Sequence, residues 1–209
     1  MNELADKKVG IFGGSFDPIH NGHLAIARAA YEDFSLDEVW FIPAGHSPNK
    51  KESDMTPAQI RYEMTALALE EYPYFHACDY EIKAEGTSYT YLTLSHFKEM
   101  YPNTTFYFIM GADSLDYFEK WRHPEIICQK AVILTAVRDE LGQTEVKDKI
   151  ESLKQLFTAE IYPLSCPKVD AASSEIRNMI QKNLPVTEML PKKVIEYIKK
   201  NHLYCHSQR

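Results

Sequence analysis

The feature that most constrains this chain is a regular alternation of short apolar segments with longer segments of helical periodicity. Six apolar segments are predicted strands, at residues 8–12, 38–42, 75–82, 105–110, 131–136 and 160–163. Helical patterns fill the intervals, at about 23–33, 57–72, 89–100, 147–157, 174–181 and 191–200. In the second of these, residues 56–59 are a predicted capping box that begins with Thr56, and Ile60, Met64 and Leu67 mark one helix face. Strands that alternate with helices form parallel sheets covered on both faces. The sequence therefore predicts an α/β fold with a doubly wound, Rossmann-like parallel sheet and a helical carboxyl-terminal segment.

Length and charge limit the classes of protein that this chain can represent. Its 209 residues, 44% of them hydrophobic, suit a single domain over 1–209, in which 171–209 form the carboxyl-terminal helical segment. A net charge of −7 argues against nucleic acid as a partner. No segment approaches the roughly 20 apolar residues of a membrane span. The four cysteines form no C-x-x-C pair, which favours reduced thiols and a cytoplasmic location.

The densest group of chemically informative residues follows the first predicted strand, in the segment GGSFDPIHNGH over residues 13–23. Gly13 and Gly14 let the backbone approach a phosphate closely, and the helix that follows directs free N–H groups and its positive end to the same place. His20 and His23 lie three residues apart at the start of this helix, so both imidazoles can face a phosphate, and Gly22 keeps the approach open. This pattern is typical of a site that stabilises charge during phosphoryl chemistry.

Other interpretations of this segment fit less well. It contains neither the P-loop pattern nor G-x-G-x-x-G, and no acidic residue ends the second strand, which disfavours a dinucleotide-dependent dehydrogenase. Two histidines suit zinc, but no third ligand is indicated nearby. A purely structural role, with glycines in a tight turn and histidines in packing, stays open for an isolated motif of this kind.

The segment from Gly14 to His23 resembles the H-x-G-H signature of the nucleotidyltransferase superfamily, and within it the bacterial nicotinate-nucleotide adenylyltransferases. The resemblance covers nearly the whole chain. It implies that His20 and His23 are catalytic. It also implies an ATP site that includes Gly13, Gly14, Ser15, Phe16, His20, Gly22 and His23.

A second phosphate motif is predicted at 171–177, which reads AASSEIR. Ser173 or Ser174 is expected to cap the next helix, and Arg177 on its first turn offers a planar fork for phosphate oxygens. The segment resembles the family's I-S-S-T-x-I-R, which implies that Ser173, Ser174, Ile176 and Arg177 bind ATP and that Arg177 is catalytic. Two alanines, the second of them Ala172, replace the leading Ile and Ser of that motif. Read without the resemblance, this is a capped surface helix with a solvated arginine.

Acceptor recognition is predicted in the segment around Thr87, Ser88 and Tyr89, which enters a helix and can offer N–H groups to a carboxylate. Trp121 offers a stacking face for a pyridine ring, and Tyr117 lies four residues before it. Taken alone, this pair is more typical of core packing than of ring binding. The resemblance favours a ring-binding role for Trp121 and leaves Tyr117 open.

The remaining site residues are implied by the resemblance and by position. Gly111 and Asp113 are expected to line the ATP site, and Arg138 lies where the family places an arginine that contacts ATP. Lys50 matches the basic residue that ends the family's P-P-H-K loop and is expected to bind substrate phosphate, whereas Asn49 replaces the histidine before it. Without the resemblance, Lys50 is a solvated loop residue.

The reaction implied is adenylyl transfer from ATP to nicotinate mononucleotide, which yields deamido-NAD and pyrophosphate. Mg²⁺ is expected to arrive with ATP, with no metal site of the protein's own and no tightly bound cofactor. The alternatives are an enzyme of the same superfamily acting on nicotinamide mononucleotide or phosphopantetheine, and a non-catalytic nucleotide sensor. Family analogy also predicts a homodimer.

Overall fold

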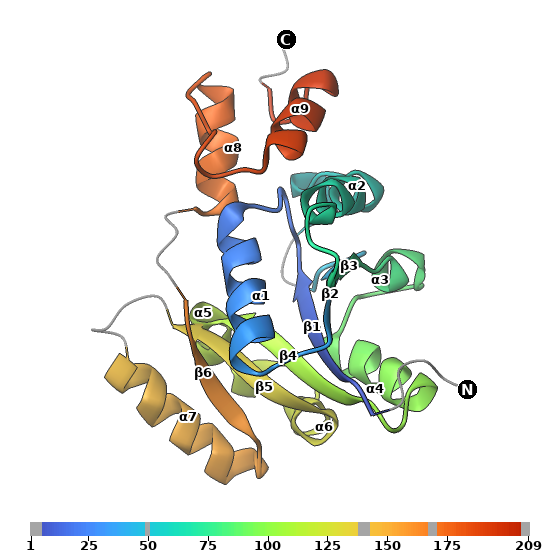
Figure 1. Cartoon of the computed structure of the whole chain (residues 1–209), viewed down its shortest axis with the longest axis vertical. Coiled ribbons are helices and arrows are strands. Elements are labelled where there is room, and N and C mark those ends of the chain that lie inside the picture. The colour runs from blue at the N-terminus through green and yellow to red at the C-terminus, as the bar shows by residue number, and fades with distance from the viewer. Residues whose placement is uncertain (1–5, 49–50, 138–142, 167–170, 206–209) are drawn as a thin grey trace.

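A computed structural model describes residues 6–48, 51–137, 143–166 and 171–205, and its centre is one parallel sheet of six strands (Figure 1). The strands are β1 (Lys8–Gly14), β2 (Glu38–Pro43), β3 (Phe75–Ala77), β4 (Thr105–Gly111), β5 (Ala131–Val137) and β6 (Ile161–Ser165). Their order across the sheet is β3-β2-β1-β4-β5-β6, and every neighbouring pair is parallel. This is the strand order of the doubly wound dinucleotide-binding fold, so the predicted fold class is confirmed.

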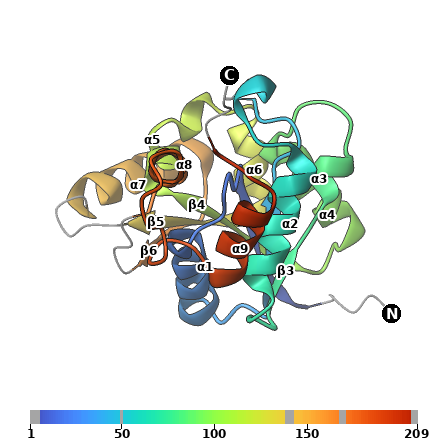
Figure 2. The same ribbon diagram turned by 90° about the horizontal axis from the view of Figure 1, so that it is seen from above.

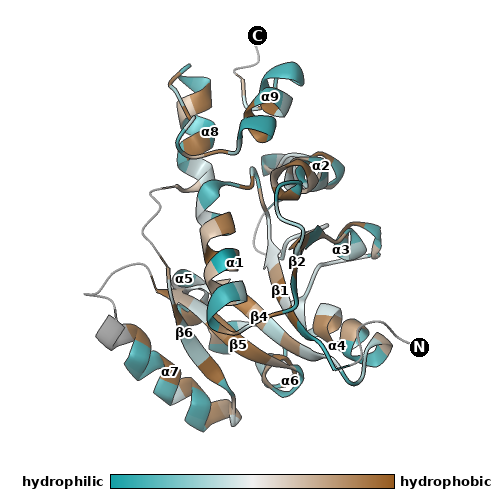
Figure 3. Cartoon of the chain, in the orientation of Figure 1, coloured by the Kyte–Doolittle hydropathy of each residue, from teal (hydrophilic) through white to brown (hydrophobic). Residues whose placement is uncertain are grey.

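The helices divide between the two faces of the sheet, as a doubly wound topology requires. They are α1 (Asn21–Asp33), α2 (Ala58–Leu69), α3 (Tyr80–Lys83), α4 (Thr90–Met100), α5 (Ala112–Asp116), α6 (Pro124–Lys130), α7 (Gln143–Phe157), α8 (Ser173–Gln181) and α9 (Lys192–Lys200), with 3-10 turns η1 (Glu52–Asp54) and η2 (Phe118–Lys120). One buried cluster joins the sheet to α1, α2, α8 and α9, and a second joins it to α4, α6 and α7. Figure 3 shows the apolar colour concentrated on the strands and on the inward faces of the helices.

The carboxyl ends of β1 and its neighbours mark the place where a ligand is expected. The chain leaves β1 toward β2 on one side, and later enters β4 on the other side of β1, so the strand order reverses there. In the ladders that flank this point, Gly14 pairs with Pro43 of β2, and Gly111 at the end of β4 pairs with Ala136 of β5. In open parallel sheets, ligands bind in the crevice beyond the carboxyl ends of the strands at such a reversal.

The carboxyl-terminal helices lie at the end of the molecule where α1 begins (Figure 1). Figure 2 shows α9 beside α2, and the Tyr197 hydroxyl of α9 donates a 2.5 Å hydrogen bond to Glu63 of α2. The segment before α9 contacts the start of α1, where the Asn21 backbone N–H donates to the Met189 carbonyl at 2.8 Å. These contacts attach α8 and α9 to the edge of the sheet where the predicted motifs lie.

Two local predictions were wrong. The strand predicted over 75–82 ends at Ala77, because the N–H groups of Ile82 and Lys83 bond to the Asp79 carbonyl and turn the chain into α3. The N-cap of α2 is Pro57 and no side chain caps it, so the expected capping by Thr56 does not form.

The buried face of α2 also differs from the predicted one. Ile60 and Leu67 are only half-buried. The buried residues are Arg61, Met64, Thr65, Ala68 and Leu69. Their spacing is that of one helix face. Of the predicted face Ile60, Met64 and Leu67, Met64 is correct, and the other two positions were wrong by one residue.

Within the described ranges, the structure contains no helix long and apolar enough to cross a membrane.

Candidate active site

The turn from β1 into α1 brings the two motif histidines together. His20 is the N-cap of α1 and is only 3% exposed. Its ring stacks on that of His23, with centroids 3.6 Å apart and an interplanar angle of 24°. The structure therefore places both imidazoles at the amino end of α1, where the helix dipole favours an anion.

The hydrogen bonds of this turn define how His23 can act. The His20 backbone N–H donates to Nδ1 of His23 at 3.2 Å, and the two residues form a reciprocal capping box. A ring nitrogen that accepts a hydrogen bond carries no proton, so the proton of the neutral His23 ring lies on Nε2. His23 is half-buried, and the edges of Phe12 and Phe16 fix its ring at centroid distances of 5.9 and 5.0 Å. In the neutral ring, Nε2 is therefore the atom of His23 that can donate a hydrogen bond to a phosphate oxygen.

Phe16 holds the turn in an uncommon backbone conformation. Its φ is +46°, in the left-handed region that bulky residues rarely adopt. Its side chain is 2% exposed and packs edge-on against Phe12, at 5.6 Å between centroids. A buried ring under a strained backbone indicates that surrounding contacts determine this loop conformation.

The second motif meets the first through backbone carbonyls. One terminal N–H of Arg177 donates to the Asp17 carbonyl at 2.7 Å, and the Ser173 hydroxyl donates to the Pro18 carbonyl at 3.0 Å. The predicted serine cap was wrong, because Ala172 is the N-cap of α8 and no side chain caps the helix. Ser173 lies one residue inside the helix, and its hydroxyl is used across the interface instead. Sequence positions about 155 residues apart are thereby joined in one site.

The other two residues predicted in this motif differ in exposure. Ser174 is exposed, whereas the Ile176 side chain is completely buried in the first core cluster. Any contact of Ile176 with a nucleotide must therefore be made by its backbone.

The predicted acceptor segment is tied to the loop after β2. The Ser88 hydroxyl accepts hydrogen bonds from the backbone N–H groups of Gly45 and His46, at 3.0 and 3.2 Å. The Ser88 N–H in turn donates to the His46 carbonyl at 2.9 Å. Thr87 is exposed, and Tyr89 is the N-cap of α4, so the segment enters a helix as predicted. A cavity of about 330 Å³ lies against this segment.

The two aromatic residues near this segment have different environments. Trp121 is half-buried and packs against Phe118 and Phe108 at 5.6 and 6.0 Å, so part of its indole belongs to the second core cluster. Tyr117 is 53% exposed, which contradicts core packing for this residue. The helix α5 ends at Asp116 and η2 follows, so Tyr117 and Trp121 do not share one helix face.

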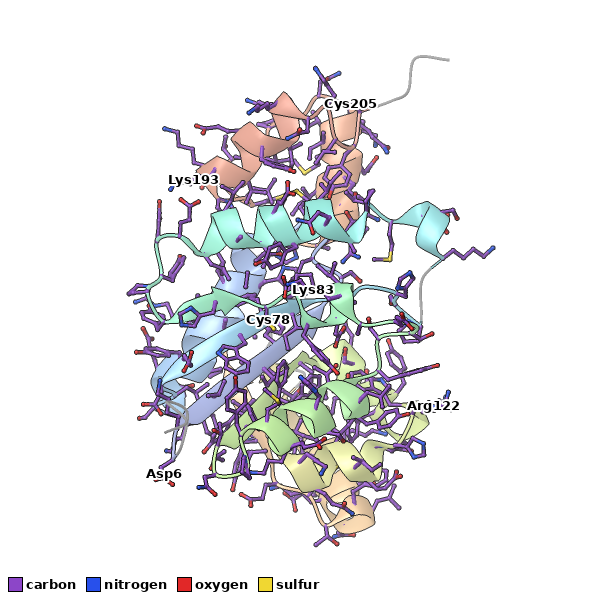
Figure 4. All side chains as sticks on the ribbon, turned by 90° about the vertical axis from the view of Figure 1, so that its right-hand side faces the viewer. Asp6, Cys78, Lys83, Arg122, Lys193 and Cys205 are labelled. Atoms are coloured by element: carbon purple, nitrogen blue, oxygen red, sulfur yellow. The ribbon has the colours of Figure 1, made fainter. Side chains whose placement is uncertain are left out.

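An arginine that was not predicted covers the ring of Tyr89. The guanidinium carbon of Arg122 lies 5.1 Å from the Tyr89 ring centroid, which is within the range of a cation–π contact. Arg122 is exposed, and Figure 4 shows it at the outer edge of the molecule.

The remaining predicted residues are placed in part. Gly111 ends β4 and is the N-cap of α5, and Asp113 is exposed on the first turn of that helix. Lys50, Asn49 and Arg138 lie outside the described residues. The roles assigned to individual residues in catalysis and binding stay predictions.

Sequence reasoning missed a buried polar group beneath the β1–α1 turn. Asp17 is 2% exposed, and its carboxylate accepts from the Tyr204 hydroxyl at 2.6 Å and from the Thr56 N–H at 3.2 Å. Burial, followed by the charge of Asp17, raises the pKa of Tyr204 far above its ordinary value, so the phenol stays protonated and donates. Arg61 is 1% exposed beside this group, and its burial lowers its pKa. No local pattern indicates these contacts, since the residues are far apart in sequence.

A second missed group lies behind the acceptor segment. Glu81 is 8% exposed, and its carboxylate accepts from the Thr93 hydroxyl at 2.6 Å. Burial raises the pKa of Glu81, while hydrogen bonds from Thr93 and Ser88 oppose the rise. Ser88 therefore connects the loop after β2 to a buried carboxyl.

Comparison with known proteins defines the class to which this fold and site belong. A family model described as cytidylyltransferase-like matches residues 11–179, a range that contains both phosphate motifs. A protein of Clostridium tetani named "Probable nicotinate-nucleotide adenylyltransferase" is 39% identical over 95% of this chain and 99% of its own. One of the same name from Clostridium botulinum strain Hall is 43% identical over 93% of this chain and 97% of its own.

Among solved structures, a Plasmodium falciparum nicotinic acid mononucleotide adenylyltransferase complexed with NaAD superimposes with a TM-score of 0.76. It is 24% identical, and the match covers 95% of this chain and 97% of that one. At this identity the likeness shows the fold alone. From the family model and the curated relatives, the chain belongs to the cytidylyltransferase-like nucleotidyltransferases and, among them, to the nicotinate-nucleotide adenylyltransferase family.

Proposed function

We propose that this enzyme transfers the adenylyl group of ATP to nicotinate mononucleotide and releases pyrophosphate. The observation that carries the proposal is the stacked pair of His20 and His23 at the amino end of α1, beside the glycines that end β1. Relatives that span nearly the whole chain carry the name of this activity. The product is deamido-NAD, which makes the reaction a step of NAD biosynthesis.

The chemistry assigned to the site is positioning and charge stabilisation. A phosphate oxygen of nicotinate mononucleotide attacks the α-phosphorus of ATP, the bond from that phosphorus to the bridging oxygen breaks, and pyrophosphate leaves with the electron pair. The attacking oxygen is ionised at neutral pH, so no strong general base is required. His20, His23 and Arg177 supply donors for the charge that develops on the α-phosphate. ATP enters as its Mg²⁺ complex, in which the metal bridges phosphates and water.

The acceptor segment supports nicotinate over nicotinamide. Thr87, Ser88 and Tyr89 lead into the amino end of α4, where backbone N–H groups suit a carboxylate better than a carboxamide. The indole of Trp121 is half-buried, and its accessible part is assigned to stacking on the pyridine ring. Gly111, Asp113, Arg138 and Lys50 are assigned to the nucleotide and phosphate contacts from their positions in the sequence.

The test is pyrophosphate release by the purified protein with Mg-ATP and, in parallel, nicotinate mononucleotide, nicotinamide mononucleotide or phosphopantetheine. We expect strong release with the first acceptor and weak release with the other two. Preference for another acceptor would overturn the assignment of Thr87, Tyr89 and Trp121. Binding of ATP without release for all three acceptors would favour a nucleotide sensor.

Variants of the histidines test the catalytic assignment. His20→Ala and His23→Ala are expected to lower turnover by about two orders of magnitude or more, because each removes a donor aimed at developing charge. The circular dichroism spectrum of each variant should match that of the wild type. Near-normal turnover in both variants would contradict the assignment.

The protein is also proposed to be cytoplasmic and to form a homodimer. A cytoplasmic location is supported by the thiols of Cys78, Cys128 and Cys205, and burial raises the pKa of the Cys128 thiol to about 11, which keeps it unreactive. Cell fractionation tests the location. A homodimer is proposed by family analogy, and light scattering on the eluted protein tests it.

A further inference from the structure

Arg61 is the largest side chain that is fully buried among the described residues, although it carries a charge. It lies on the inward face of α2, one turn before Met64 and Thr65. A buried guanidinium is unfavourable unless all of its donors are satisfied. The partners of Arg61 therefore indicate what this residue does.

The Arg61 side chain donates hydrogen bonds to main-chain carbonyls. Nε donates to Thr56 at 2.8 Å, Nη1 to Ser15 at 2.6 Å, and Nη2 to Ala44 at 2.6 Å and to Gly45 at 3.4 Å. Its charge is balanced at a distance by Asp17, which opposes the effect of burial on its pKa. One rigid fork thus joins the loop after β1, the loop after β2 and the segment that precedes α2.

The bond to Ser15 fixes a peptide unit of the proposed ATP loop. In a trans peptide the C=O and the following N–H point in opposite directions. With the Ser15 carbonyl directed at Arg61, the Phe16 N–H points away from Arg61. Phe16 has a left-handed φ of +46°, so this peptide orientation has to be maintained by its neighbours.

The bond to Ala44 fixes a second peptide unit, which leads to the acceptor segment. The Ala44 carbonyl accepts from Arg61, and the N–H of the same peptide unit, at Gly45, donates to the Ser88 hydroxyl at 3.0 Å. The Ala44 N–H also donates to the Gly14 carbonyl at 2.9 Å. The loop between the two subsites is therefore anchored to both, and Arg61 holds the centre of the connection.

We propose that Arg61 is a positioning residue that aligns the ATP loop with the acceptor segment by fixing the Ser15–Phe16 and Ala44–Gly45 peptide units. It does not touch the substrates. The kinetic test of this role rests on the adenylyl transfer proposed above. Arg61 comes from α2 and belongs to neither phosphate motif. Because both subsites depend on one side chain, its loss should weaken both substrates together.

The main experiment measures kcat and both KM values for Arg61→Lys, Arg61→Gln and Arg61→Ala. We expect the KM for ATP and the KM for nicotinate mononucleotide each to rise by about tenfold or more in all three, with a fall in kcat. Lysine can donate to only some of the carbonyls that Arg61 bonds, so Arg61→Lys should recover less than half of the kcat/KM that Arg61→Ala loses. Guanidinium ion added to Arg61→Ala should restore activity, whereas equal concentrations of sodium chloride or urea should not.

The matched control is Met64→Ala, which opens a cavity on the same buried face and removes no hydrogen-bond donor. It should lower the melting temperature and leave both KM values within about twofold of the wild type. If Met64→Ala changes the KM values as Arg61→Gln does, the effect is one of general stability and the proposal is wrong. Unchanged KM values in folded Arg61→Gln would also overturn it.

A variant at a less buried position keeps the proposal testable if the Arg61 variants do not fold. Ser88→Ala removes the acceptor of the Gly45 N–H from a half-buried position. We expect it to raise the KM for ATP as well as that for nicotinate mononucleotide. A rise confined to nicotinate mononucleotide would refute the connection between the subsites.

Calorimetric titration of ATP alone separates this proposal from the proposed function. Suppose that the wild type uses an acceptor other than nicotinate mononucleotide and that the Arg61 variants bind ATP more weakly than the wild type. That result would support the positioning role of Arg61 and would overturn only the proposed acceptor. Equal ATP binding by wild type and variants would overturn the positioning role, whatever the acceptor.

Discussion

Replacing Gly45 by alanine tests how closely the loop after β2 is packed against the element behind the acceptor segment. A Cβ on Gly45 would lie 2.1 Å from the carbonyl oxygen of Glu81 and 3.0 Å from its carbonyl carbon. Both obstacles are backbone atoms, so no side-chain rotation can relieve the contact. The backbone of one segment has to move instead.

The expected magnitude follows from this geometry. Carbon–oxygen contacts usually lie at about 3.3 Å or more, so the two segments must separate by roughly 1 Å. Overpacking of this kind costs about 1–3 kcal/mol of stability. The displacement also breaks the bond from the Gly45 N–H to Ser88, which adds about 1 kcal/mol. A loss of about 2–4 kcal/mol corresponds to a fall in melting temperature of roughly 4–16 °C for a chain of this size.

The assay is thermal unfolding followed by circular dichroism, with Gly111→Ala as the matched control. Gly111 ends β4 at the proposed site, a Cβ there meets no atom within 4 Å, and its φ of −77° suits alanine. We expect Gly111→Ala to change stability by no more than about 0.5 kcal/mol. Equal melting temperatures for Gly45→Ala and Gly111→Ala would refute the packing argument, since of these two positions a Cβ meets obstructing backbone at Gly45 and no atom at Gly111.

Three further predictions concern other parts of the site. Glu81→Gln removes a carboxyl whose pKa is raised by burial. Because the buried carboxyl is more stable protonated, the wild type should lose stability relative to the variant as pH rises above about 4.5. Melting temperatures of both proteins between about pH 4 and 8 test this. Ser173→Ala should cost about 1 kcal/mol in urea unfolding, since it removes a hydroxyl that bonds across the interface, while exposed Ser174→Ala should cost less than about 0.5 kcal/mol. Gly22→Ala places a Cβ 3.0 Å from Nδ1 of His20 and should displace that ring by a few tenths of an ångström, which lowers kcat by roughly three- to tenfold with little change in melting temperature.

The fold was predictable because its signal is local. All six strands begin within one residue of their predicted starts, and most of them span compact apolar runs, such as 105–110 and 131–136. The error at 75–82 has a physical cause, since alternating apolar residues such as Tyr80 and Ile82 imitate a strand. Hydrogen bonds to the Asp79 carbonyl form a turn there instead, and periodicity carries no information about them.

The candidate site was predictable where one continuous segment supplies it. The residues from Gly13 to His23 lie in a single strand–turn–helix unit, so their order in the chain already sets their arrangement in space. Arg61 gave no comparable signal. A charged residue on an amphipathic helix is normally assigned to the solvated face, and only the tertiary structure shows that carbonyls from three separate segments surround it.

Asp17 connects the carboxyl-terminal segment to the loop of the proposed active site. The Asp17 carbonyl accepts from Arg177 of α8, and its carboxylate accepts from Tyr204, which follows α9. Because the pKa of Tyr204 is raised far above its ordinary value, this hydroxyl remains a donor at every pH at which the enzyme would work. The loop that presents His20 is thus bonded to residues up to 187 positions away, so its geometry depends on the docking of the last helices as much as on its own sequence. A motif of ten residues identifies the chemistry, but the site that performs it is complete only when the carboxyl-terminal segment is in place.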